Sequence, residues 1–275
     1  GFSIANTKTR NLDNPNNWMF KEYYRFLNDL EPEWFLFENV EGFKSFDNGN
    51  FANNIENEFR ELGYTTSSSV LTASDFGVPQ KRNRFFIVGN KNGIVFDFSL
   101  LKRQPLITVG EALSDLPQNL HNGEHREECS YTKKADTSYL RIMREKAKAP
   151  LQNLVSRNKE YVIERYKHIK HGGNWQDIPS ELMQNYSNTK NMHSGIYKRL
   201  DPSQPSVVIA NYRKSMLIHP YEHRGLSLRE AARLQSFPDH VIFEGPLSYK
   251  QQQIGNAVPP LLAKAIFQEI VKLSI

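Results

Sequence analysis

The sequence has little cysteine and no long apolar run. One cysteine, Cys129, stands among 275 residues, which excludes an internal disulfide and a cysteine-rich zinc site and fits a reducing compartment such as the cytoplasm. No apolar run reaches the roughly 18 residues that a membrane span needs, and residues 1–6 show no basic stretch leading into an apolar one. These absences exclude membrane and secreted proteins and predict no metal site. The length allows two domains or one large one.

The basic residues are unevenly distributed. The chain has 35 Lys and Arg against 30 Asp and Glu, and residues 118–215 hold 17 of the basic but only 10 of the acidic residues. That segment therefore carries a net charge of +7, and the rest of the chain −2. A concentration of positive charge predicts a polyanion-binding surface. A solvated basic insertion remains the alternative.

Hydrophobic periodicity in the first third predicts alternating helices and strands. Helices are expected at residues 18–27 and 52–62, and strands at 34–37, 64–71 and 84–89. This order indicates an α/β layer with a parallel or mixed sheet.

The pattern weakens after residue 118, which marks a candidate second domain with a helix at residues 138–147. Ser227 and Glu230 form the sequence signature of a capping box and predict a helix through Gln235. Gly255 is expected to break a further helix, and a last helix is expected at residues 260–273.

Three short strings carry candidate chemistry. Glu38 of Glu-Asn-Val follows the apolar strand, where ligands of α/β sheets usually bind, so it is a candidate acid or a structural charge. Gln80, Arg82 and Arg84 would share one face of a strand and offer donors to an anion or a base edge, or form a polar strand entrance. The Gln-Ile-Gly-Asn-Ala-Val-Pro-Pro string at residues 253–260 predicts a turn that brings backbone close to a ligand, or a tight turn between helices.

Taken in order, these strings resemble the DNA cytosine-5 methyltransferase family. The matching strings are Glu-Asn-Val (38–40), Gln-x-Arg-x-Arg (80–84), Arg-Glu-Ala-Ala-Arg-Leu-Gln-Ser-Phe-Pro-Asp (229–239) and Gln-Ile-Gly-Asn-Ala-Val-Pro-Pro (253–260). The resemblance covers nearly the whole chain except about residues 118–192, where such enzymes vary. It implies an α/β fold, with part of a Rossmann-like S-adenosylmethionine-dependent sheet and a second, smaller DNA-recognition domain.

The resemblance also implies domains and partners. Residues 1–117 would form the second half of a catalytic domain, residues 118–249 a target-recognition domain and hinge, and residues 250–275 a return to the catalytic domain. Double-stranded DNA is the expected substrate, S-adenosyl-L-methionine the expected cofactor, and a restriction-modification system the expected setting.

One departure from the family pattern is serious. The family's nucleophile is a cysteine in a Pro-Cys-Gln loop, typically followed by Gly-Phe-Ser, and the chain starts with Gly-Phe-Ser. The Gly-rich cofactor loop is also missing. Cys129, flanked by Glu127, Glu128 and Ser130, lacks the electropositive setting of a reactive thiolate. We therefore expect the C-terminal part of a methyltransferase, completed by an N-terminal polypeptide or segment that carries both loops.

The resemblance implies a role for each candidate residue. A thiolate adds to cytosine C6, which makes C5 able to accept a methyl group. Glu38 would protonate or hydrogen-bond N3 with a carboxyl whose pKa burial raises. Arg82 and Arg84 would hold the cytosine O2, and Ser3 and Gln80 would contact DNA. The cofactor pocket would be closed on one side by Asn256, Ala257 and Val258.

Two other functions remain open from the sequence. A non-catalytic DNA-recognition subunit would need neither Glu38 nor the two arginines, so their presence argues against it. An RNA cytosine-5 methyltransferase would share the fold, and the long basic insertion favours duplex DNA.

Overall fold

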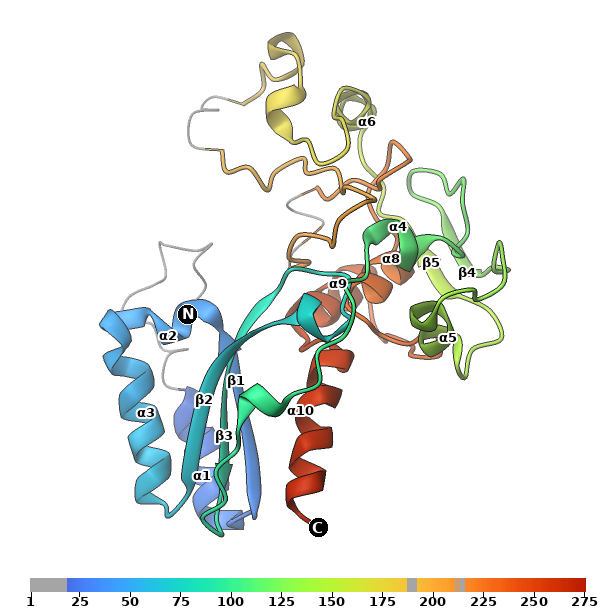
Figure 1. Cartoon of the computed structure of the whole chain (residues 1–275). Helices are drawn as coiled ribbons and strands as arrows, with labels where there is room; N and C mark the ends of the chain where they lie inside the picture. Colours follow the sequence, from blue (N-terminus) through green and yellow to red (C-terminus); the bar gives the residue numbers. More distant parts are fainter. Residues whose placement is uncertain (1–18, 187–191, 211, 213–215) are drawn as a thin grey trace. The chain divides into compact units, whose positions relative to one another are not determined.

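The computed structural model describes residues 19–186, 192–210, 212 and 216–275 (Figure 1). The chain forms two compact units. Unit 1 comprises Gly1–Ala73, Arg82–Arg103 and Lys264–Ile275, and unit 2 comprises Ser74–Lys81 and Gln104–Ala263. The chain therefore passes from one unit to the other several times, and Ser3 lies outside the described residues.

Unit 1 contains a three-stranded sheet in the order β1-β3-β2. Its strands are β1 (Trp34–Val40), β2 (Thr65–Thr72) and β3 (Asn83–Asn90). Both outer strands pair with β3 in the antiparallel sense. The expectation of a parallel or mixed ladder is wrong for these strands, because β2 leads into the central strand without a crossover helix.

Helices pack on one face of this sheet. They are α1 (Phe20–Leu30), α2 (Glu41–Lys44) and α3 (Asn50–Glu61), with a 3₁₀ turn at Phe46–Gly49. A further 3₁₀ turn, Phe98–Leu100, follows β3 in the chain. Aromatic rings from these helices and from the odd-numbered strand positions form the core. The Phe59 ring lies edge-on to those of Phe35 and Phe37, with centroids 5.0 and 5.7 Å away, an arrangement that adds to simple burial of area.

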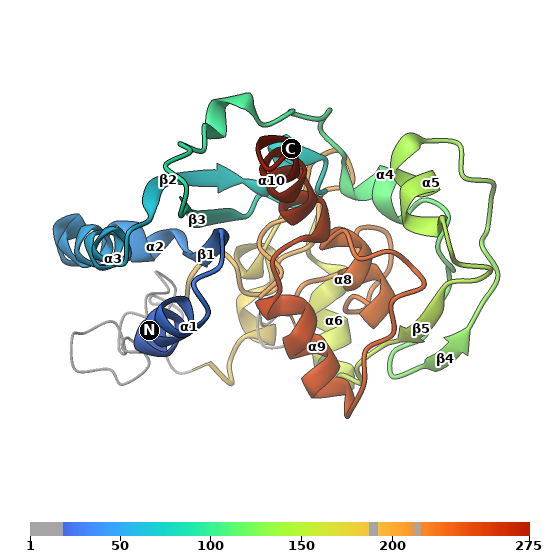
Figure 2. The same cartoon turned by 90° about the horizontal axis from the view of Figure 1, so that it is seen from below.

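Both faces of β3 are covered. Its residues Phe85, Phe86, Ile87 and Val88 are at most 1% exposed although their side chains alternate in direction. The residues of α10 (Pro260–Leu273) that belong to unit 1 lie on the side of the sheet opposite α1 and α3 in both views (Figures 1 and 2). Unit 1 is thus a layered α/β structure, as the sequence predicts.

Unit 2 has shorter elements and more irregular chain. Its helices are α4 (Val109–Leu113), α5 (Ser138–Arg144), α6 (Glu160–Lys167), α8 (Leu228–Leu234) and α9 (Leu247–Asn256), and it also contains the first residues of α10. Its strands β4 (His125–Glu128) and β5 (Leu151–Leu154) form an antiparallel pair. Short 3₁₀ segments occur at Trp175–Asp177 and Ser180–Leu182, and Ala73–Phe76 spans a junction between the units. None of the helices in the described ranges is both long and apolar enough to cross a membrane.

Two predictions from the sequence concern helix ends in unit 2, namely the capping box and the helix end at Gly255. The capping box is confirmed: the Ser227 hydroxyl accepts from the Glu230 N–H, and the Glu230 carboxylate accepts from the Ser227 N–H at 2.7 Å. The helix end predicted at Gly255 is confirmed to within one residue, because α9 ends at Asn256. Glycine is needed at position 255 for space, since a Cβ would lie 2.1 Å from the Ala210 carbonyl oxygen.

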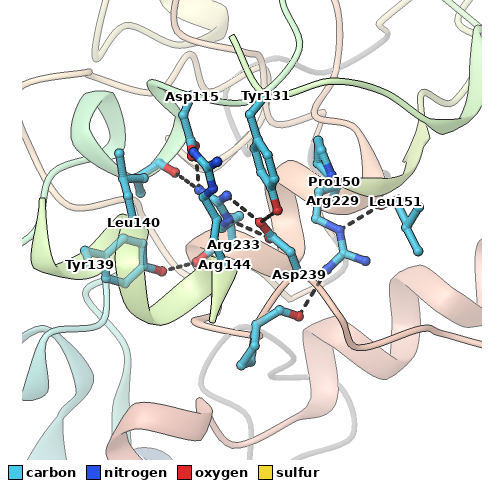
Figure 3. A network of polar contacts seen from close by, with 12 residues as sticks. Asp115, Tyr131, Tyr139, Leu140, Arg144, Pro150, Leu151, Arg229, Arg233 and Asp239 are labelled. Atoms are coloured by element: carbon cyan, nitrogen blue, oxygen red, sulfur yellow. Dashed lines mark hydrogen bonds and ion pairs between the residues drawn. The ribbon is translucent and has the colours of Figure 1, made fainter. Parts of the chain in front are cut away.

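A buried ionic network fixes the centre of unit 2 (Figure 3). The Arg233 guanidinium bonds Asp115 at 2.9 Å and both carboxylate oxygens of Asp239, and all three side chains are 0% exposed. Tyr131 donates to Asp239 at 2.7 Å, and Arg144 reaches Asp115 at 3.3 Å. Two acids and two arginines are therefore neutralised within one cluster, as buried charges require.

Candidate active site

Glu38 lies inside β1, two residues before the strand ends at Val40. It is directly opposite Phe86 of β3, whereas Arg84 is opposite Val40. Side chains two positions apart share a face, so Glu38 and Arg84 lie on the face opposite the aromatic residues Phe35 and Phe37. The sheet itself thus places a carboxyl and a guanidinium as diagonal neighbours.

The Glu38 carboxylate and the Arg84 guanidinium are in contact. Their Oε1 and Nε atoms are 2.8 Å apart, and the side chains are 27% and 11% exposed. Burial raises the pKa of Glu38, and the positive charges of Arg84 and Arg82 offset only part of that rise. Burial lowers the pKa of Arg84 against the opposing effect of Glu38. The expected upward shift of the Glu38 pKa is thus present.

Arg82 precedes β3 and is 1% exposed. Its carbonyl accepts from the Ala73 N–H at 2.9 Å, which fixes the backbone where β2 ends and β3 begins. Burial and the neighbouring charge of Arg84 lower the pKa of Arg82 to about 9, with Glu38 acting in the opposite direction. Glu38, Arg82 and Arg84 therefore form one electrostatic cluster in unit 1.

Gln80 lies in unit 2 and not on a strand with the two arginines. Its backbone forms an isolated bridge with Ser206, and its side chain is 0% exposed. The amide donates to Gln235 Oε1 at 2.5 Å and accepts from the Ile209 N–H at 3.0 Å. The expectation that Gln80, Arg82 and Arg84 share a strand face is wrong, since β3 starts only at Asn83. These contacts give Gln80 a structural role and provide no support for DNA binding.

The predicted cofactor-binding residues lie at the end of α9. Asn256 is exposed and Ala257 and Val258 are half-buried. The Gln235 amide donates to the carbonyl of Ile254 at 2.9 Å and to that of Ala257 at 3.1 Å. Because Gln235 also receives the Gln80 bond, one buried glutamine joins three of the four sequence strings. Sequence reasoning did not select this residue, although it belongs to the matched string of residues 229–239.

Cys129 lacks the properties of an activated nucleophile. It is a free cysteine of intermediate burial, just after β4. Burial raises the pKa of its thiol, Glu124 and Glu128 act in the same direction, and Arg126 opposes them. A raised pKa reduces the thiolate fraction at neutral pH. That Cys129 is not the nucleophile stays a prediction, and the raised pKa supports it.

The unit 1 cluster can perform a definite kind of chemistry. A carboxyl with a raised pKa can donate a proton or hydrogen bond near neutral pH. The guanidinium beside it offers fork-like donors for a carbonyl or anionic oxygen. Together they suit a reaction in which a planar heterocycle gains negative charge.

A family model described as C-5 cytosine-specific DNA methylase matches residues 1–272. The chain belongs to the C-5 cytosine-specific DNA methylase family. The resemblance drawn from the four strings is thereby confirmed, and so is the α/β methyltransferase fold.

Relatives of this methylase come from several bacteria. The chain is 32% identical to the type II methyltransferase M1.HphI of Haemophilus parahaemolyticus over 275 residues, covering 100% of the chain and 66% of the relative. It is 32% identical to M.DdeI of Desulfomicrobium norvegicum over 292 residues, covering 98% of the chain and 70% of the relative. The chain thus spans about two thirds of the length of these methyltransferases.

A solved structure supports the fold of this methylase. It is described as a DNA modification methyltransferase encoded within an E. coli prophage, and it matches with a TM-score of 0.76 at 24% identity. The match covers 95% of this chain and 75% of that chain.

Proposed function

We propose that this chain contributes the base-binding acid and cations of a DNA cytosine-5 methyltransferase of a restriction-modification system. The Glu38–Arg84 contact of 2.8 Å, with the raised pKa of Glu38, is the observation that carries the proposal. Membership of the methylase family and the type II methyltransferase relatives support it.

In this proposal each unit 1 side chain acts on a cytosine flipped out of duplex DNA, since C5 is inaccessible within the helix. The Glu38 carboxyl gives a proton or hydrogen bond to ring N3, which stabilises the charge that develops when a thiolate adds to C6. Arg84 and Arg82 hold the cytosine O2. Glu38 thereby exchanges part of its contact with Arg84 for a contact with the base.

The end of α9 is proposed to contact S-adenosyl-L-methionine. Asn256 has an exposed amide, for which the described chain provides no side-chain partner, next to the half-buried Ala257 and Val258. One hydrogen-bonding group beside two apolar ones fits part of a nucleoside and not a complete site. The cofactor supplies the methyl group, and these residues would hold one side of it.

The thiolate is proposed to come from a polypeptide segment that also carries a Gly-rich cofactor loop. The single cysteine of the chain, Cys129, has a raised pKa. An apolar pair on α10 supports a covering segment: Phe267 and Val271 are four residues apart and are 51% and 58% exposed. Two exposed apolar side chains on one helix face favour an interaction surface.

The test is reconstitution. A relative's segment with its Pro-Cys-Gln loop is fused or added to the chain, and transfer of labelled methyl groups to duplex DNA and to RNA is measured. We expect 5-methylcytosine in DNA from the combination and none from the chain alone. Cys129→Ser should leave the reconstituted activity unchanged. Robust activity of the chain alone, loss of activity with Cys129→Ser, or methylation of RNA in place of DNA would contradict the proposal.

We also propose that residues 118–249 provide target recognition, with residues 1–117 and 250–275 in the catalytic part. The net charge of +7 on residues 118–215 supports a DNA-facing role. Exchanging residues 118–215 for those of a relative should change the methylated sequence and retain the chemistry. Retention of the original target would refute this division.

A further inference from the structure

An open cleft of about 710 Å³ lies in unit 2, beside the end of β4 and the residues that follow α5. Four cationic side chains line it, against one acid, Glu128. The cations are Lys133, Lys134, Arg144 and Lys148. An excess of cations around one concave surface concentrates positive potential and favours a polyanion.

Two of the four cations are already paired. Lys133 contacts Asp136 at 2.8 Å, and Arg144 contacts Asp115 at 3.3 Å. Lys134 and Lys148 are exposed and have no side-chain partner among the described residues. These two lysines can therefore bind an external anion without breaking an internal contact.

The wall of the cleft is fixed by the buried network of Figure 3. The Arg144 guanidinium lies 3.7 Å from the centroid of the Tyr131 ring, and it donates to the Lys133 carbonyl at 3.0 Å. Tyr131 in turn donates to the buried Asp239. This anchoring reduces the entropy lost when Arg144 contacts a ligand.

We propose that this cleft binds backbone phosphates of duplex DNA, with Lys134 and Lys148 as the direct contacts and Arg144 as a fixed donor. The inference rests on the proposed function, because it assigns a DNA-contacting surface to the methylase. The open form favours a nucleic acid strand over a free nucleotide, since small-molecule sites enclose most of their ligand. Phosphate contacts of this kind position the protein and do not read sequence.

The first experiment measures DNA binding by the reconstituted enzyme against salt concentration. Lys134→Ala with Lys148→Ala should weaken binding to all duplex sequences and reduce the salt slope by about two units, close to one per lost phosphate contact. The control, Lys102→Ala with Lys264→Ala, removes the same charge from exposed lysines that lie outside the cleft and outside residues 118–249. A salt slope equal to that of the control would overturn the proposal.

The second experiment uses Cys129, which lines the cleft and is the only cysteine of the chain. Alkylation by N-ethylmaleimide is followed by mass spectrometry of the peptide that contains Cys129. Mixed-sequence duplex DNA should slow this reaction several-fold, and inorganic phosphate or a free nucleotide at equal ionic strength should not. Unchanged alkylation with DNA, or equal protection by the small anions, would overturn the assignment.

The two proposals fail separately. If methylation and its dependence on Glu38 are intact while the lysine variants match their control, only the cleft assignment is wrong. If the reconstituted enzyme forms no 5-methylcytosine, the proposed function fails.

Discussion

Buried arginines have different surroundings in the two units. In unit 1 the core is aromatic, and Arg82 and Arg84 share the field of one partly exposed carboxyl, Glu38. Arg84 bonds groups of two residues, Glu38 and Asn83. In unit 2 each buried arginine bonds groups of at least three residues, most of them carboxylates or backbone carbonyls. These arginines are Arg165, Arg199, Arg224, Arg229 and Arg233.

The buried arginines of unit 2 bond many backbone carbonyls because much of this unit is irregular chain. Loops that are buried leave carbonyl groups without the partners that a helix or sheet provides. An arginine has five N–H donors and can satisfy several carbonyls at once. Arg199 illustrates this, since its guanidinium donates to the carbonyls of Tyr166, Ile169, His219 and Glu222. In unit 2, arginine side chains thus satisfy carbonyl groups that a helix or sheet would otherwise satisfy. In unit 1, the arginines instead lie beside a carboxyl that can exchange partners.

The buried arginines of unit 2 change the interpretation of the basic segment, residues 118–215. Arg165 and Arg199 belong to the basic segment of residues 118–215, yet both are buried at 3% exposure. Arg165 donates to the Leu182 carbonyl at 2.8 Å. Part of the net charge of +7 therefore holds the fold together and is not available to DNA.

The largest expected effect comes from removing the central arginine of unit 2. Arg233→Ala leaves Asp115 and Asp239 as buried carboxylates without their main partner, so the free energy of unfolding should fall by about 3–5 kcal/mol. Urea denaturation measures this loss. The control Arg141→Ala removes an exposed arginine of α5 and should change stability by less than about 0.5 kcal/mol. Similar values for the two variants would show that arginine does not stabilise unit 2 in this way.

The second-largest expected effect is on the methylation rate, through the Glu38 carboxyl of unit 1. Glu38→Gln in the reconstituted enzyme should slow single-turnover methylation by about 100-fold or more, the scale of a lost general acid. DNA binding should change much less. Near-normal methylation would make Glu38 a structural partner of Arg84, comparable to the carboxylates of unit 2.

The pH dependence of the same reaction sharpens this prediction. A raised pKa keeps Glu38 protonated to higher pH than an ordinary glutamate. The methylation rate should therefore fall as pH rises through that raised pKa, and Glu38→Gln should remove this part of the pH profile. A rate that instead rises through the same range would mean that the ionised carboxylate is the active form.

A smaller effect is expected at the end of α9. Asn256→Ala should weaken S-adenosyl-L-methionine binding by about fivefold, which corresponds to one neutral hydrogen bond. DNA binding and stability should be retained, because the Asn256 side chain is exposed. Calorimetry on the reconstituted enzyme provides both affinities. Unchanged cofactor affinity would make the end of α9 purely architectural.

The sequence predicted local features better than pairing partners. Short apolar runs located β1 and β3. β2 is mostly Thr and Ser, and it was located only as a strand-like stretch after Gly63. The antiparallel order of the three strands was missed, since no residue type records the direction of a neighbouring strand. The separation of Gln80 from Arg82 was missed for a related reason. Side chains alternate between two faces only within a strand, and the chain leaves unit 2 for unit 1 between these two residues.

The Glu38–Arg84 pair was predictable only in part. Both residues were selected from the sequence, but their contact requires the register that places Arg84 opposite Val40. The buried ionic network of unit 2 was harder to predict from the sequence than the Glu38–Arg84 pair. Arg229, Glu230 and Arg233 read as an ordinary polar helix face, yet all of them are at most 2% exposed.

The smallest effect separates polar contacts from burial within unit 2. Tyr139 and Tyr166 are both buried, at 2% and 0% exposure. The Tyr139 hydroxyl donates to the Arg233 carbonyl, whereas that of Tyr166 has no hydrogen-bond partner in the described part of the chain. Each Tyr→Phe change removes one oxygen atom and leaves the ring in place. Tyr139→Phe should therefore lower the free energy of unfolding by about 1 kcal/mol, and Tyr166→Phe should leave it unchanged or raise it.

Urea denaturation of the two phenylalanine variants decides between two views of unit 2. A difference between them would show that bonds to the Arg233 network stabilise this unit beyond the burial of its rings. Equal losses would require a partner for the Tyr166 hydroxyl, and the cavity of about 20 Å³ beside it has room for one bridging water molecule. In that case solvent, together with arginine, would satisfy the buried polar groups of the irregular unit, and the contrast with the aromatic core of unit 1 would become greater.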